Sequence, residues 1–163
     1  MLVSKIYCSP IGNMLIRATE VGICGLTIGS EPALQDDLAQ QNPFIRQAIE
    51  QLDAYFAGVQ KHFDLPLDLQ GTPFQQRVWQ ELQRIPFGHT ITYAQLAARI
   101  GQPEAVRAVA AANSRNPVWI IVPCHRVIGT DGSLTGYAGG LWRKEWLLNH
   151  EQLNMVHKQL SLF

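Results

Sequence analysis

The sequence predicts an α/β protein of two lobes: an N-terminal α/β lobe with a small antiparallel sheet, and a mainly helical C-terminal lobe with a helix-turn-helix. Three observations predict this. Short β-prone runs open the chain, helical periodicity dominates its second half, and a Gly-Thr-Pro signal separates the two at residues 71–73. Of the 163 residues, 47% are hydrophobic and 16% charged. That composition provides a substantial core and excludes a disordered chain or a large multidomain protein.

The N-terminal lobe is expected over residues 1–71 and begins with three β-prone runs, at 3–8, 13–19 and 23–28. Turn-forming residues separate these runs, which is typical of an antiparallel meander. The period of the apolar residues then changes. From 43 to 56 they recur at helical spacing, and a glycine follows, so this segment is predicted to be an amphipathic helix.

The C-terminal lobe is expected over residues 72–163, and its first residues give an N-cap followed by a first-turn proline. Two of its expected helices, at 93–100 and 104–114, are joined by a Gly-Gln-Pro turn. This pattern favours a helix-turn-helix, although many similar helical hairpins bind nothing. The elements expected in order are helices at 74–84, 93–100 and 104–114, a buried strand or extended segment at 118–122, a glycine-rich loop at 129–140 and a helix at 143–150.

The second helix of this pair carries one long cation, Arg107, among alanines. Such a smooth face can lie close to a nucleic-acid groove while the arginine reaches inward. The alternative is a solvated arginine on a helix that is rich in alanine because alanine favours helices.

The charges and cysteines narrow the class of protein. The net charge is zero, but residues 1–71 carry four basic and eight acidic side chains, whereas residues 72–163 carry nine and five. An anionic partner is therefore expected at the C-terminal lobe, unless this is ordinary scatter of surface charge. No apolar run approaches the roughly 20 residues of a membrane helix, and the N-terminus lacks the basic start and apolar block of a signal peptide. The three cysteines are an odd number, so they cannot all pair as disulfides within the chain. We expect a soluble, cytoplasmic protein with at least one free thiol.

The residues around Cys124 suggest nucleophilic chemistry. His125 and Arg126 follow this cysteine directly, after an apolar segment. A free thiol is only about 3% thiolate at pH 7, so a nucleophilic cysteine needs a cationic setting or a base. His125 can accept the proton, and Glu151 can fix the tautomer of the imidazole. The result would be a Cys-His-carboxylate triad, although an inert buried cysteine beside a surface histidine is the commoner arrangement.

Several motifs stand in order along the C-terminal lobe: Thr92-Tyr93-Ala94-Gln95-Leu96-Ala97, Arg107-Ala108-Val109, Asn116-Pro117, Pro123-Cys124-His125-Arg126-Val127, Gly136-Tyr137-Ala138-Gly139-Gly140 and Lys144-Glu145-Trp146-Leu147-Leu148, then Glu151. With them, residues 72–151 resemble the O6-alkylguanine-DNA alkyltransferase family, also called methylated-DNA–protein-cysteine methyltransferases. The N-terminal lobe supports this less specifically, through Ser9-Pro10-Ile11-Gly12 and Tyr55-Phe56-Ala57-Gly58. The resemblance implies a ribonuclease H-like N-terminal lobe and a winged-helix-like C-terminal lobe.

The resemblance also implies direct, one-step DNA repair. Cys124 would take the alkyl group from O6 of guanine, and from O4 of thymine, and keep it as a thioether, so that the protein is consumed. A soft thiolate suits displacement at an sp3 carbon, and a thioether has no easy hydrolytic exit. No cofactor is implied. The implied partner is double-stranded DNA containing O6-alkylguanine, bound by a protein that is a monomer in solution, with cooperative binding on DNA left open and no membrane involved.

Roles for individual residues follow from the same resemblance. Glu151 would orient His125, which would remove the Cys124 proton through a bridging water, while Asn116 pins the turn that shapes the site. Tyr93 would address N3 of the guanine and face the phosphate of the flipped nucleotide. Because the target atom is inaccessible in a stacked duplex, the base must leave the helix, and the finger entering from the minor groove would be Arg107. The other DNA contacts would be Ala108, Ala111 and Ser114, and the base pocket would be lined by Asn113, Trp119, Val127, Tyr137 and Ala138.

Two features depart from the family pattern. Trp119 stands where a smaller residue is common, so it is expected to narrow the pocket or to stack on bulky adducts. Some family members bind a structural zinc in the N-terminal lobe, but Cys8, Cys24 and His62 do not reproduce a zinc spacing, and we expect no metal.

Rival functions remain at this point. A non-catalytic damage-binding protein would normally lack the cysteine, whereas a cysteine hydrolase or amidase would use Cys124, His125 and Glu151 and turn over. A methyl-sensing transcription regulator would need a further DNA-binding domain, for which the chain has no residues left.

Overall fold

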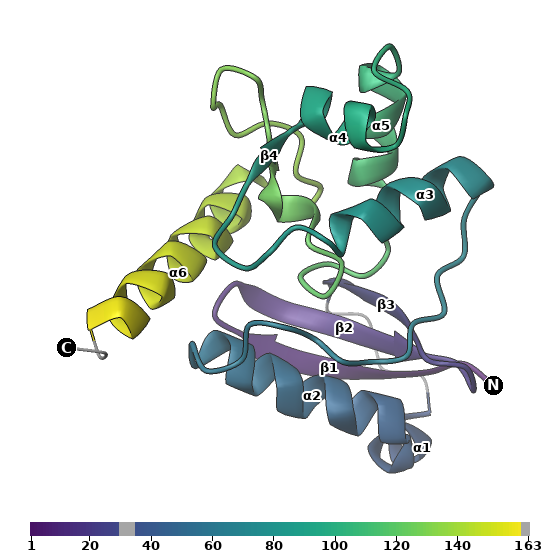
Figure 1. The fold of residues 1–163 in the computed structure, drawn as a ribbon. Helices are drawn as coiled ribbons and strands as arrows, with labels where there is room; N and C mark the ends of the chain where they lie inside the picture. Colours follow the sequence, from purple (N-terminus) through teal and green to yellow (C-terminus); the bar gives the residue numbers. More distant parts are fainter. Residues whose placement is uncertain (30–34, 161–163) are drawn as a thin grey trace. The chain divides into compact units, whose positions relative to one another are not determined.

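The computed structural model describes residues 1–29 and 35–160 and divides into two compact units (Figure 1). The first comprises Met1–Gln70 with Pro117–Trp119, and the second comprises Gly71–Asn116 and the chain from Ile120 onward. The first unit is a sheet with helices and the second is mainly helical, which confirms the predicted α/β fold class. None of the helices in the described ranges is long and apolar enough to cross a bilayer.

The first unit is built on an antiparallel meander. Its strands are β1 (Val3–Ser9), β2 (Gly12–Ala18) and β3 (Ile23–Ile28), in the order β1-β2-β3, within about a residue of the predicted runs at most bounds. The β1–β2 hairpin pairs Ser9 with Gly12, and a φ of 116° at Gly12 explains the glycine at this turn. The segment Pro117–Trp119 adds a parallel bridge from Val118 to Leu26.

Two helices accompany this sheet, α1 (Asp36–Gln41) and α2 (Pro43–Phe56). The bounds of α2 match the prediction because its start signals are strong. The side chain of Asn42 accepts hydrogen bonds from the backbone N–H groups of Phe44 and Ile45 at 2.9 and 3.1 Å, and Pro43 occupies the first turn. The face of α2 that is buried consists of Ile45, Ala48, Leu52 and Tyr55.

The second unit contains a helix-turn-helix. It is formed by α4 (Tyr93–Arg99) and α5 (Val106–Ser114), preceded by α3 (Pro73–Leu82). The helices α3 and α4 begin with capping boxes, at Thr72 and Thr92, in which the N-cap side chain and a glutamine three residues later satisfy each other's backbone N–H groups. The indole N–H of Trp79 donates to the Ala112 carbonyl at 2.9 Å and so ties α3 to α5.

The expected strand at 118–122 is wrong beyond Val118. Residues 119–122 form a turn, and Ile120 has a φ of 71°, which a β-branched residue rarely adopts. The buried, β-branched run was therefore a poor guide to backbone conformation, because apolar runs of this length fit several buried structures. The turn leads into η1 (Cys124–Arg126), a single 3-10 turn, and then β5 (Val127–Ile128), which pairs in parallel with β4 (Ile91–Thr92).

The last helix is longer than predicted. It spans Leu141–Leu160 as α6, whereas the expectation was 143–150. Neither glycine nor proline occurs in residues 141–160, so nothing in that stretch ends the helix early. The predicted glycine-rich loop at 129–140 contains neither helix nor strand.

Candidate active site

The sulfur of Cys124 lies in the second unit at the start of η1, and the residue is only 4% exposed. Its backbone N–H donates to the Val122 carbonyl at 2.8 Å, and its carbonyl accepts from the side-chain Nδ2 of Asn113 at 3.3 Å. The nucleophile predicted from the sequence is therefore fixed on both sides by hydrogen bonds within one compact unit.

Two predicted partners, His125 and Glu151, are brought together. The imidazole lies on η1, the carboxylate lies on α6, and Nε2 of His125 is 2.7 Å from Oε2 of Glu151. Both side chains are fully buried, and Nδ1 of His125 has no hydrogen-bond partner among the described residues. Because Glu151 holds Nε2–H, the neutral imidazole has its lone pair at Nδ1, which is the arrangement a general base requires.

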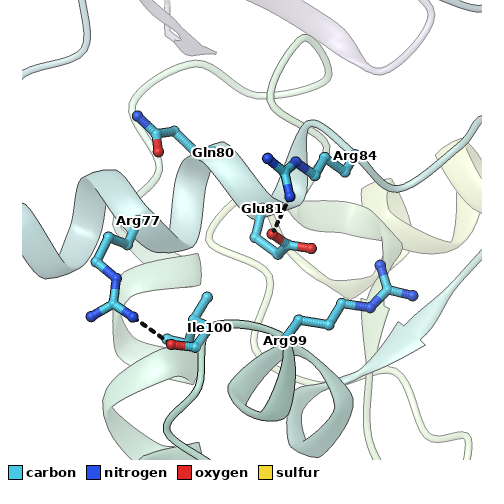
Figure 2. Close-up of a pocket in the computed structure, with 6 residues that line it drawn as sticks. All are labelled: Arg77, Gln80, Glu81, Arg84, Arg99 and Ile100. Carbon is cyan, nitrogen blue, oxygen red and sulfur yellow. Dashed lines mark hydrogen bonds and ion pairs between the residues drawn. The ribbon is translucent and has the colours of Figure 1, made fainter.

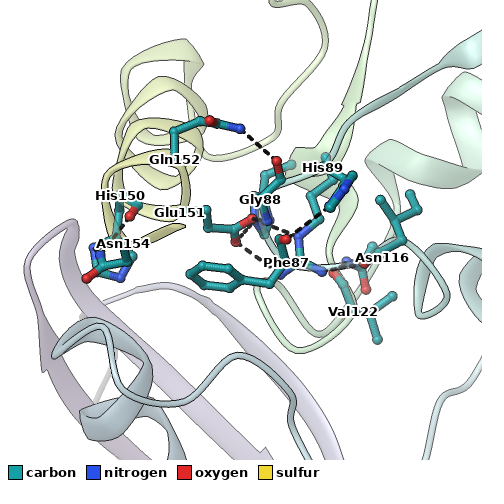
Figure 3. A network of polar contacts seen from close by, with 12 residues as sticks. Phe87, Gly88, His89, Asn116, Val122, His150, Glu151, Gln152 and Asn154 are labelled. Atoms are coloured by element: carbon teal, nitrogen blue, oxygen red, sulfur yellow. Dashed lines mark hydrogen bonds and ion pairs between the residues drawn. The ribbon is translucent and has the colours of Figure 1, made fainter. Parts of the chain in front are cut away.

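Arg126 and the backbone hold Glu151 in place. The guanidinium meets the carboxylate with two bonds, Nε to Oε1 at 2.9 Å and Nη2 to Oε2 at 3.1 Å, and it also donates from Nη1 to the Ile85 carbonyl at 2.6 Å. The backbone N–H of Gly88 donates to Oε1 at 3.1 Å (Figure 3). Burial alone would raise the pKa of Glu151, but His125 and Arg126 hold it well below its ordinary value, so the carboxylate is charged at neutral pH.

The thiol and the imidazole are both neutral at rest. Burial raises the pKa of Cys124 to about 11, although a hydrogen bond from Asn116 and the charge of Lys144 act in the opposite direction. Burial likewise lowers the pKa of His125, and the neighbouring Glu151 only partly offsets this. The cationic setting expected from the sequence does not produce a standing thiolate, so the thiol must lose its proton to a base during the reaction.

Asn116 fixes the turn that precedes the nucleophile. Its Nδ2 donates to the Val122 carbonyl at 2.7 Å across the turn that contains the left-handed Ile120 (Figure 3). This bond satisfies the buried Val122 carbonyl, two residues before Cys124, and holds the strained backbone conformation at Ile120. The structure therefore brings this predicted site residue next to the nucleophile.

A lysine that sequence reasoning left without a role joins Tyr93 in the site. The Tyr93 hydroxyl and the Nζ of Lys144 both donate to the Thr135 carbonyl, at 3.0 and 2.7 Å, and Nζ lies 5.7 Å from the centre of the tyrosine ring. Lys144 is 0% exposed, and burial lowers its pKa to about 8, with the charge of Cys124 acting against this. The sequence places Lys144 in the motif that follows the glycine-rich loop. Nothing in the sequence indicated that this lysine is buried.

The predicted DNA-contact residues of α5 share its exposed face: Arg107, Ala108, Ala111 and Ser114. Of the predicted pocket residues in this unit, Asn113 and Val127 are buried, Tyr137 is buried in the loop, and Ala138 is exposed. Trp119 belongs to the first unit instead, where its backbone N–H donates to the Leu26 carbonyl at 2.9 Å. Its influence on adduct size stays a prediction.

The comparisons with known proteins agree over both units. Residues 2–69 match the family model described as 6-O-methylguanine DNA methyltransferase, ribonuclease-like domain, and residues 73–153 match the DNA binding domain of the same name. A methylated-DNA–protein-cysteine methyltransferase of Methanosarcina barkeri is 48% identical over 90% of this chain and 95% of its own. The chain belongs to the 6-O-methylguanine DNA methyltransferase family.

Solved structures of this methyltransferase family also resemble the chain. The O6-methylguanine methyltransferase of Mycobacterium tuberculosis is 43% identical, with a TM-score of 0.83 over 94% of both chains. A crystal structure of Mycobacterium tuberculosis OGT in complex with DNA is 44% identical, with a TM-score of 0.80 over 93% of both chains.

A second feature of the unit lies apart from this methyltransferase site. Figure 2 shows an open pocket between α3 and α4, lined by arginines and one glutamate. Arg77 donates to the Ile100 carbonyl at the end of α4, and Arg84 lies 3.5 Å from Glu81. The first of these contacts links α3 to the end of α4, whereas the second is a local pair at the C-terminal end of α3. Within residues 1–29 and 35–160, no group of three or more His, Cys, Asp or Glu side chains gathers as a metal site.

Proposed function

We propose that this protein is a methylated-DNA–protein-cysteine methyltransferase that repairs O6-alkylguanine, and O4-alkylthymine, by moving the alkyl group irreversibly to Cys124. The observation that carries the proposal is the buried constellation of Cys124, His125 and Glu151 in a chain of this family. A thiol that is neutral at rest, next to a neutral imidazole with an unpartnered nitrogen, suits a single deprotonation coupled to alkyl transfer.

The reaction needs one proton transfer and one displacement. Nδ1 of His125 takes the Cys124 proton through a bridging water, and the charged Glu151 stabilises the imidazolium that forms. The sulfur then bonds to the alkyl carbon while the bond from that carbon to O6 breaks, leaving its electron pair on the guanine. The Tyr93 hydroxyl stabilises this developing charge by a hydrogen bond to N3. The proton lost by the thiol is finally transferred to the dealkylated guanine.

The damaged base must leave the duplex to reach Cys124. The exposed face of α5 suits a close approach to the minor groove because its side chains are small apart from Arg107. In this proposal Arg107 fills the space left in the base stack, and Val127, Tyr137 and Ala138 line the pocket that receives the base. The cost of a few kcal/mol for extruding the base is smaller for a weakly paired, damaged base.

The protein acts without a cofactor, on double-stranded DNA, as a monomer in solution. All three cysteines, Cys8, Cys24 and Cys124, are free thiols. Free thiols fit the reducing cytoplasm in which we place the protein.

Mass spectrometry separates this function from its rivals. After incubation with a duplex that carries O6-methylguanine, the peptide containing Cys124 should gain about 14 Da, the mass of one methyl in place of a proton. The variant Cys124→Ser should bind the same duplex without gaining mass. Binding by the wild type without an adduct would indicate a damage-binding protein, and catalytic turnover of an ester or amide would indicate a hydrolase.

A further inference from the structure

A tight turn between α3 and β4 contacts α6 at two successive residues. The turn is closed by a hydrogen bond from the His89 N–H to the Pro86 carbonyl at 3.1 Å. Within it, the Gly88 N–H donates to Oε1 of Glu151 at 3.1 Å, and the Gly88 carbonyl accepts from Nε2 of Gln152 at 2.7 Å (Figure 3). Both backbone polar groups of one residue are therefore bonded to adjacent side chains of α6.

The turn needs a glycine at this position for two reasons. Gly88 has a φ of 80°, in the left-handed region that favours glycine. A Cβ added there would lie 2.6 Å from Cγ of Met155, which stands one helical turn beyond Glu151. The backbone of Gly88 therefore approaches α6 closely, and the two hydrogen bonds are made at this approach.

The Gly88 bond bears on the proton acceptor of the proposed reaction. Oε2 of Glu151 lies 2.7 Å from Nε2 of His125, and Arg126 donates to both carboxylate oxygens from the same 3-10 turn. Gly88 adds a donor from a separate segment of the chain. Burial lowers the pKa of His125, and Glu151 opposes this effect while Arg126 and Lys144 add to it. Loosening the carboxylate therefore weakens the interaction that favours the imidazolium.

We infer that Gln152 is a positioning residue for alkyl transfer, and that it acts by holding the Gly88 backbone against Glu151. The Gly88 N–H in turn fixes the carboxylate that is bonded to His125. Gln152 is exposed, and it acts on the reaction through this chain of hydrogen bonds. The inference rests on the proposed function, because His125 is the base in that reaction.

A purely structural role is the alternative. Gln152 would then brace the turn against α6, and its loss would lower stability or slow transfer without changing the pH at which the base titrates. A positioning role predicts two effects together. A carboxylate that is less well held makes His125 harder to protonate, so transfer slows at its plateau and the acid limb of the pH profile moves to lower pH.

The experiment measures single-turnover methyl transfer from an O6-methylguanine duplex between about pH 4.5 and 8. Gln152→Met keeps the length of the side chain and removes its donor. We expect the plateau rate to fall by about threefold to tenfold, as for the loss of one neutral hydrogen bond, and the midpoint of the acid limb to fall by about half a pH unit.

The matched control is Gln83→Met. Gln83 is also exposed, and its amide donates to a backbone carbonyl, that of Trp79, at 3.4 Å. This bond is local to the end of α3 and is not connected to Glu151. The control should keep the wild-type rate and midpoint.

A second variant acts on the same contact from the other side. Gly88→Ala places a Cβ against Met155 and makes the φ of 80° unfavourable, so it should move the turn away from Glu151. Its midpoint should shift in the same direction as that of Gln152→Met, and a folded Gly88→Ala protein with the wild-type midpoint would overturn the inference. If Gly88→Ala does not fold, as judged by thermal melting, the exposed Gln152 still decides.

The outcomes for Gln152→Met separate the two roles. A lower plateau together with a lower midpoint, and neither change in Gln83→Met, supports the inference. A midpoint that is unchanged or raised overturns it, whether or not the rate falls, and so does an equal shift in the control. Wild-type protein that transfers no methyl group contradicts the proposed function instead, which is a different result from transfer with an unchanged midpoint.

Discussion

At the scale of single residues, burial determines the charge states in the candidate active site. It raises the pKa of Cys124 to about 11 and lowers the pKa of His125, so the resting pair is a thiol and a neutral imidazole. Glu151 stays charged because it is bonded to both His125 and Arg126. The proton therefore has an acceptor inside the protein, and the reaction needs no standing thiolate.

This arrangement predicts the pH dependence of methyl transfer. His125 must be neutral to accept the proton, and its pKa lies below the ordinary 6.5. The single-turnover rate should therefore be constant from pH 8 to 7 and fall only below about 6.5, by tenfold per pH unit once the imidazole is protonated. A rate that instead climbs tenfold per unit between pH 7 and 9 would show that hydroxide, rather than His125, removes the thiol proton.

The buried carboxylate gives a prediction for stability. Because the pKa of Glu151 is lowered in the folded protein, its charge contributes stability above the unfolded value, near 4.5, that is lost as the pH falls toward the folded pKa. Glu151→Gln should cost about 3–5 kcal/mol at pH 7, since Arg126 is left buried without its counter-charge. The variant should also lose less of its melting temperature than the wild type on acidification from pH 7 to 3.

The matched control for this variant is Glu81→Gln. Glu81 pairs with an Arg84 side chain that is 77% exposed, at 3.5 Å. Removing such a surface pair should change stability by about 0–1 kcal/mol. Equal melting temperatures for the two variants would contradict the account of Glu151.

At the scale of elements, local signals in the sequence determined which helices could be predicted. The N-cap residue and proline at the start of α2 made the start of this helix predictable. The turn between α4 and α5 likewise made the helix-turn-helix predictable. The turn at 119–122 could not be predicted from its apolar residues, because a side chain outside the run, Asn116, fixes it. Neither could the burial of Arg126 and Lys144, since their partners lie on distant segments. Helix propensity and hydrophobic periodicity depend on residues that are close in the sequence. Whether a charged side chain is buried depends instead on contacts that form only when the unit has folded.

The capping box of α4 connects an element to the site. The Thr92 hydroxyl accepts from the Gln95 backbone N–H at 3.0 Å, directly before Tyr93. Thr92→Ala should destabilise the protein by about 1 kcal/mol and slow transfer, because the first turn that positions Tyr93 loosens. Thr72→Ala is the control, since it removes the same capping box from α3 at a similar cost in stability. The rate of transfer and chemical unfolding check both, and equal rates in the two variants would contradict the positioning role.

At the scale of the whole molecule, charge and function are divided along the chain. Residues 72–163 carry nine basic and five acidic side chains, and they include the candidate nucleophile and α5. Residues 1–71 carry the acidic excess. We therefore expect binding to undamaged duplex DNA to weaken as salt is raised, because cations of the C-terminal part replace counterions on the phosphates.

Arg107 should separate base extrusion from alkyl transfer. The side chain is exposed on α5, so Arg107→Ala should change stability by no more than about 0.5 kcal/mol and the melting temperature by no more than about 2 °C. Transfer from a lesion in a duplex should slow at least tenfold, and more than transfer from the same lesion in a single strand, where no stacked space needs filling. Equal slowing on both substrates would show that Arg107 does not act in extrusion.

The central claim is that Cys124 accepts one alkyl group and is consumed. Titrating a fixed amount of O6-methylguanine duplex with protein and counting the lesions that remain tests it most directly. We predict a linear loss of lesions that ends at one per protein molecule, with no loss for Cys124→Ser. Continued removal beyond one lesion per molecule, or removal by the serine variant, would contradict the account.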